Sequence, residues 1–93
     1  MAGFKQGVVS VGTTATRICT IGAAPDTDRV IVQNNGTTAV FLGGSDVTTS
    51  GATAGVQVAA NGTLTVPTTG AEPLTLFGIC ASGTNNASYL FPG

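Results

Sequence analysis

Short runs of apolar and strand-forming residues alternate with turn residues along the whole 93-residue chain. Runs of this length, bounded by Gly, Asn, Asp, Pro and Ser, are typical of β-strands, and no stretch has the period of a helix. The expected strands span residues 6–12, 15–21, 29–34, 38–43, 56–60, 63–67, 74–81 and 87–91. The pattern predicts a single all-β domain over residues 1–93, an antiparallel β-sandwich or a jelly-roll-like small barrel of seven to eight short strands.

Two Asn-Gly pairs predict how some of these strands connect. Asn35–Gly36 separates the runs 29–34 and 38–43, and Asn61–Gly62 separates the fifth run from the sixth. An Asn-Gly pair favours a type I′ hairpin turn, because both central residues of that turn need a positive φ. We therefore expect residues 38–43 to pair back on residues 29–34, and a second hairpin to form around Asn61–Gly62.

The remaining segments differ in their polarity. Residues 43–55 are too polar and glycine-rich for a core, which predicts a long surface loop or a ragged edge segment.

Residues 1–6 could form an N-terminal arm. The run 74–81 is apolar on both faces, as in a central strand or one covered by a neighbouring subunit. In the sixth run, alternation predicts that Leu64 and Val66 face inward.

Charged residues are scarce: three basic and four acidic, with no histidine. An ordinary domain is about a quarter charged. Ser45 lies beside Asp46, but no histidine can activate it as a nucleophile. Gly43 and Gly44 lack the remaining residues of a phosphate-binding loop. We therefore expect no enzymatic activity. Three scattered cations also argue against nucleic-acid binding, and no apolar run is long enough to span a membrane.

The acidic residues offer little for ligand binding. Asp26 and Asp28 precede Arg29 in one loop, where turn formation is favoured over a cation site, since two carboxylates do not make a calcium loop. Glu72 is interpreted as a solvated loop carboxylate, with an ion pair to a cation across a subunit contact as the alternative. Without histidine or a CxxC motif, we expect no metal and no cofactor.

Cys19 and Cys80 are the only cysteines, and each lies in a strand-like run. The N-terminus has no apolar core of signal-peptide length, so we expect synthesis in the cytoplasm, where disulfides are rare. Buried free thiols are therefore favoured, and a disulfide stays open as the alternative.

Large side chains near both ends of the chain are candidates for contacts between subunits. An aromatic residue so close to each terminus suggests that both ends dock, either on the domain's own core or on another chain, and both alternatives remain open. The apolar run 74–81 adds two more candidates. The candidate inter-subunit or capsid contacts are Phe4, Lys5, Phe77, Ile79, Tyr89, Leu90 and Phe91.

Two phrases of the sequence carry a resemblance to a known family. They are DRVIVQNNGTTAVFLGGSDVTTSG at residues 28–51 and TGAEPLTLFGICASGT at residues 69–84. With them, roughly residues 8–91 resemble the small β-rich capsid decoration (minor capsid) proteins of tailed bacteriophages, especially actinobacteriophages. The resemblance implies a virion structural protein without catalytic residues, made in the bacterial host cytoplasm and bound to the outside of the phage head. It also implies a homotrimer whose partner is the major capsid protein.

An alternative is a phage tail or fibre β-module that binds a host surface. Such a module is expected to expose aromatic residues in its long loop, and residues 43–55 contain none. The decoration subunit is therefore the favoured hypothesis.

Overall fold

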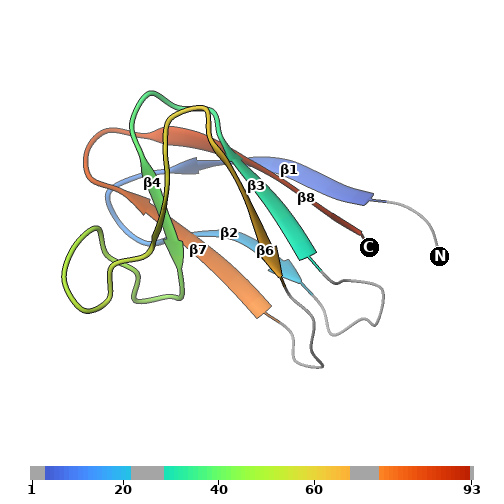
Figure 1. Cartoon of the computed structure of the whole chain (residues 1–93), viewed down its shortest axis with the longest axis horizontal. Coiled ribbons are helices and arrows are strands. Elements are labelled where there is room, and N and C mark those ends of the chain that lie inside the picture. The colour runs from blue at the N-terminus through green and yellow to red at the C-terminus, as the bar shows by residue number, and fades with distance from the viewer. Residues whose placement is uncertain (1–3, 22–28, 68–73, 93) are drawn as a thin grey trace.

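The computed structural model describes residues 4–21, 29–67 and 74–92. Its strands are β1 (Phe4–Val11), β2 (Thr16–Ile21), β3 (Arg29–Asn34), β4 (Val40–Gly43), β5 (Val56–Val58), β6 (Thr63–Pro67), β7 (Leu74–Cys80) and β8 (Asn85–Pro92). They form two four-stranded sheets, sheet A with the order β1-β8-β3-β6 and sheet B with the order β2-β7-β4-β5 (Figure 1). All strand pairs are antiparallel, and the described residues contain no helix. The predicted all-β sandwich is confirmed.

The core lies between the two sheets and follows the alternation of the strands. In β3 the buried side chains are Val30, Val32 and Asn34, two residues apart as a strand requires. Sheet B contributes Val40 and Leu42 of β4 in the same way. Small and medium aliphatic side chains thus fill most of the interior, as expected of a chain with few aromatic residues.

Several predicted features agree with the structure. The strands 29–34 and 63–67 have the expected bounds, and Leu64 and Val66 pack against the core. The run 74–81 becomes β7, which is central because it pairs with both β2 and β4. β1 begins at Phe4, so residues 4–6 belong to a strand and not to an arm.

The predicted hairpin between residues 29–34 and 38–43 is wrong. β3 pairs with β6 and β8 in sheet A, whereas β4 pairs with β5 and β7 in sheet B. The physical reason is the side chain of Asn34, which accepts a hydrogen bond from the Gly36 N–H (2.9 Å) and donates one to the Thr38 carbonyl (2.7 Å). These bonds turn the chain out of sheet A. A Cβ at position 36 would overlap the Asn85 side chain, so this corner requires glycine.

The hairpin predicted at Asn61–Gly62 is also wrong. Asn61 does adopt a positive φ of 62°, as its turn chemistry suggests. The turn, however, joins β5 in sheet B to β6 in sheet A. Both Asn-Gly pairs therefore lie at corners where the chain crosses between sheets.

Residues 44–55 connect β4 to β5 and contain one residue of the interior. An isolated bridge links Thr48 to Ala54, and the hydroxyls of Thr48 and Thr53 lie 2.8 Å apart. Val47 is only 3% exposed and packs close to Gly43 and Gly55. The expectation that nothing in this segment belongs to the core is thus wrong for Val47.

Candidate functional site

The outer face of sheet A carries exposed apolar side chains. Phe4 (66% exposed) and Val8 (63%) alternate along β1 with the inward-facing Val9 and Val11, and Leu90 of β8 (36%) lies beside them. Because Leu90 pairs with Gln6, between Phe4 and Val8, its side chain is a diagonal neighbour of both. We call Phe4, Val8 and Leu90 the β1 patch.

Two observations set the β1 patch apart from other exposed apolar residues. The half-buried Ile31 of β3 pairs with Leu90 and extends the apolar surface across the sheet. Val56 and Leu74 are also exposed, but they lie on separate strands of sheet B. A scattered apolar side chain is ordinary on a protein surface, whereas a contiguous patch marks an interaction site.

β1 is also an edge strand. Its eight residues pair with β8 without interruption, and no described residue pairs with its other side. The other three edges are less open to pairing: β5 has three residues, β6 ends at Pro67, and β2 has an irregular register between Arg17 and Cys19. Proline and bulges prevent an edge from pairing with a further strand, and β1 has neither.

The aromatic residues near the C-terminus belong to the domain's own core. Phe91 is 7% exposed, and the half-buried ring of Tyr89 stacks on it with a centroid distance of 5.9 Å. A Cβ on Gly7 would come within 2.7 Å of the Tyr89 hydroxyl, so the glycine leaves room for this ring. Phe91 therefore packs on the domain's own core, one of the two alternatives expected for the chain ends, whereas Leu90 on the opposite face stays exposed.

Phe77 and Ile79 lie on the outer face of sheet B and are half-buried. Phe77 pairs with Arg17 on β2, and Ile79 pairs with Phe41 on β4. The candidate contacts are thus divided among the β1 patch, the core and this second surface, and the structure does not bring them into one site. Phe41 was not identified from the sequence, although its position between Val40 and Leu42 indicates an outward side chain.

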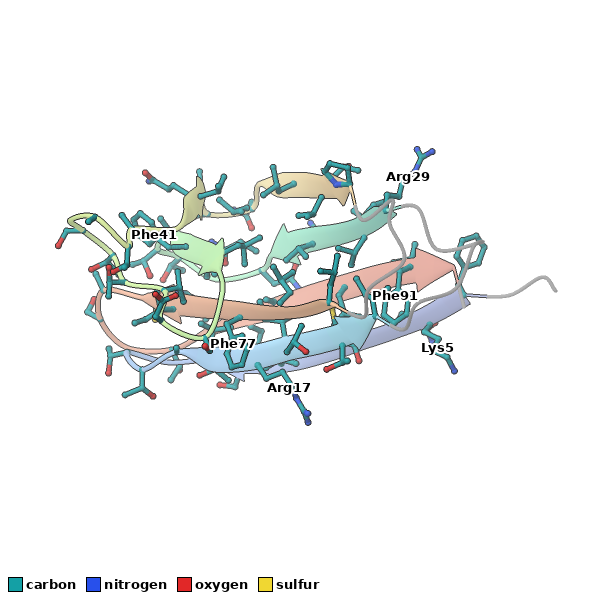
Figure 2. The ribbon with its side chains drawn as sticks, turned by 90° about the horizontal axis from the view of Figure 1, so that it is seen from below. Lys5, Arg17, Arg29, Phe41, Phe77 and Phe91 are labelled. Carbon is teal, nitrogen blue, oxygen red and sulfur yellow. The ribbon has the colours of Figure 1, made fainter. Side chains whose placement is uncertain are left out.

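The charges of the described residues are spread over the surface. Lys5 and Arg17 are exposed and point to one side of the molecule, while Arg29 points to the opposite side (Figure 2). Arg29 makes an interaction of its own. The residues Asp26, Asp28 and Glu72 lie outside the described residues.

Ser45 and Asp46 are both exposed in the loop after β4. Within the described part of the chain no three His, Cys, Asp or Glu side chains come together as metal ligands. Asp46 is therefore not part of a metal-binding cluster within the described ranges.

Both cysteines are buried free thiols. Burial raises the pKa of Cys19 from 9.0 to about 11. The Cys80 sulfur lies 3.3–3.5 Å from four carbonyl oxygens, those of Val11, Gly12, Ser82 and Gly83. The Cys80 thiol thus contacts both the end of β1 with its following turn and the turn after β7, which indicates a structural role. A reactive cysteine must be accessible to solvent, and both of these thiols are buried.

One apolar cavity of about 210 Å³ lies between the ends of the two sheets. It is lined by Ile21, Val30, Gly43, Gly44, Val66, Leu74, Thr75 and Leu76. None of these side chains is charged, and only the threonine hydroxyl could orient a ligand. Ligand sites normally combine an apolar lining with several convergent polar groups, so the β1 patch and edge remain the better candidate.

Comparisons with known proteins give no further guide. No protein-family profile, no curated protein and no solved structure matches the chain. Among the described residues, no helix is long and apolar enough to cross a membrane.

Proposed function

We propose that this chain is a structural subunit of a phage virion that binds the outside of the head and stabilises the shell. The observation that supports this proposal is the β1 patch, an exposed apolar surface on a strand whose edge is unpaired among the described residues. Such a surface favours contact with another protein. The resemblance to capsid decoration proteins supplies the partner, the major capsid protein.

The size of the β1 patch indicates how the stabilisation works. Full burial of a Val, Leu or Phe side chain is worth about 1.5–3 kcal/mol, and these three are between one third and two thirds exposed. Covering the patch therefore contributes about 3–4 kcal/mol, which is less than the cost of bringing two proteins together in many estimates. One contact of this kind is weak, so the proposal requires several contacts repeated over the shell.

Binding of this kind stabilises a shell by mass action. A protein that binds assembled capsid subunits and not dissociated ones shifts the equilibrium toward the assembled shell. No acid, base or cofactor is needed for this role, which suits a chain with seven charged residues, three basic and four acidic. The homotrimer implied by the resemblance stays a prediction. The tail or fibre alternative has less support, because residues 43–55 carry no aromatic side chain.

The test is co-sedimentation of the purified chain with shells made of the major capsid protein alone. We expect the wild-type chain to bind and to raise the temperature at which the shells break. The variant Phe4→Ser/Leu90→Ser should lose most of this binding, whereas Thr63→Ser/Thr65→Ser, which alters exposed residues on β6, should bind normally. Equal binding by both variants would show that the β1 patch is not the contact, and no binding by the wild type would reject the decoration role.

A further inference from the structure

We infer that β1 pairs antiparallel with β1 of a second copy, which joins two copies of sheet A into one continuous sheet across a two-fold axis. The inference deepens the proposed function, on which it rests for its biological meaning, by naming a neighbour of the subunit. It concerns the backbone edge of β1, whereas the proposed shell contact concerns the outer face of sheet A, and Val8 takes part in both.

The β1 edge fits a strand better than any other edge of the domain. It is eight residues long and continuous in its pairing with β8, and it contains no proline. Its outer-facing row, Phe4, Gln6, Val8 and Ser10, contains no charge. An edge of this kind presents backbone donors and acceptors that another strand can complete.

The register follows from which face each residue occupies. A two-fold pair keeps the outer faces together only if outward residues lie opposite outward residues. Centring the pair on Val8 places Val8 opposite Val8, Gln6 opposite Ser10, and Lys5 opposite Val11. Two highly exposed valines then cover each other, and β-branched side chains make favourable cross-strand pairs.

Charge disfavours the neighbouring registers. With Val8 at the centre, the two Lys5 residues are six positions apart, about 20 Å, which is beyond the distance at which salt screens them. Centring on Gln6 would bring the lysines within two positions of each other. Centring on Gly7 would place the amide of Gln6 opposite the apolar Val8. Centring on Val9 would place the apolar Val8 opposite the hydroxyl of Ser10. Among these registers, only the one centred on Val8 both keeps the lysines apart and places Val8 opposite an apolar residue on the outer face.

A second copy fits this edge better than a head-to-tail ring. In a ring, β1 would pair with β6 of the next copy, and β6 has five residues and ends at Pro67. The isologous pair uses the longest edge twice, and two-fold dimers are the commonest closed assemblies. The homotrimer implied by the resemblance is therefore the competing prediction, and a trimer through β1 and β6 would overturn the inference.

The decisive test is cross-linking of single-cysteine additions under mild oxidation. Opposite Cα atoms in an antiparallel pair are about 4.5–5.5 Å apart, within the range of a disulfide. Val8→Cys should therefore form a covalent dimer. Ser10→Cys is the matched control, because the two Ser10 positions would be four residues apart, about 14 Å. The native thiols are buried in both variants. Equal cross-linking of the two variants, or none in either, would overturn the register.

The mass of the protein in solution provides a second measurement. We expect the wild-type chain to show twice the mass of one chain in sedimentation equilibrium. Val8→Lys should weaken association about tenfold, because it places like charges opposite each other, and Thr65→Lys on the outer face of β6 should not. A monomer or a trimer at all concentrations would reject the pairing. A dimer that does not bind shells would reject the proposed function alone, and a monomer that binds shells would reject the pairing alone.

Discussion

The buried amide of Asn34 is the feature whose removal should most clearly test the account of the fold. Asn34 is 1% exposed, and its Nδ2 donates to the carbonyls of Thr38 (2.7 Å), Val58 (3.0 Å) and Ala59 (3.3 Å). Its Oδ1 accepts from the Gly36 N–H (2.9 Å). One side chain of sheet A thus fixes both corners at which the chain crosses between the sheets.

The expected effect of Asn34→Ala follows from these bonds. The amide has two N–H hydrogens and one carbonyl, which together support about three hydrogen bonds worth about 1 kcal/mol each. We therefore expect the free energy of unfolding to fall by about 3 kcal/mol, a large share of the roughly 5–15 kcal/mol of an ordinary domain. With a urea m-value of about 2 kcal/mol/M, the midpoint should decrease by about 1.5 M.

Urea unfolding followed by far-ultraviolet circular dichroism measures this change. Asn35→Ala is the matched control, since Asn35 is exposed and its Nδ2 donates to the Ser88 hydroxyl (2.6 Å) and to no other described side chain or carbonyl. The control should cost less than about 1 kcal/mol. Asn34→Asp keeps the shape but, when ionised, presents only acceptors to these carbonyls, so it should cost at least as much as alanine. If Asn34→Ala were no more destabilising than Asn35→Ala, the amide would not hold the corners.

Three further changes test other parts of the structure. Gly36→Ala should lower the free energy of unfolding by about 1–3 kcal/mol, because the added Cβ would overlap the Asn85 side chain. Gly44→Ala, at an exposed position, should change it by no more than about 0.5 kcal/mol. Equal thermal midpoints for the two variants would contradict the close packing of Gly36 against Asn85. Val47→Ala should cost about 2 kcal/mol in urea unfolding, and no cost would show that the loop after β4 has no anchor in the core. The free energy of unfolding should fall as pH rises from about 9 to about 11, because the unfolded chain then releases the Cys19 proton that the folded chain retains. Cys19→Ala should remove this part of the dependence of stability on pH. An unchanged pH dependence in that variant would contradict the raised pKa of Cys19.

The sequence predicts the strands of this domain better than it predicts their pairing. Residues 29–34 and 63–67 could be bounded because alternation and flanking turn residues are local signals. The Asn-Gly pairs also mark real turns, but turn chemistry does not indicate which sheet the next strand joins. The residue that could have indicated the crossing between sheets is Asn34. It alternates in phase with Val30 and Val32 and therefore places a polar side chain in the interior.

The exposure of the candidate contact residues could be predicted from the sequence only in part, for a similar reason. Leu90 and Phe91 are adjacent in a strand, so only one of them can face outward, and the alternation with Ala87 indicates that it is Leu90. The exposure of Phe4 and Val8 depends on which side of β1 meets sheet B. That is a property of the packed sheets, which no local pattern in residues 4–11 determines.

The position of β8 has a consequence for how the chain is made. β8 is formed by residues 85–92, yet it lies between β1 and β3, and within the described residues it is the only strand that pairs with β1. During synthesis, β1 therefore has no strand to pair with until residues 85–92 have left the ribosome. Until then the apolar residues of β1 are exposed to other nascent chains, and sheet A can be completed only after β8 has been synthesised.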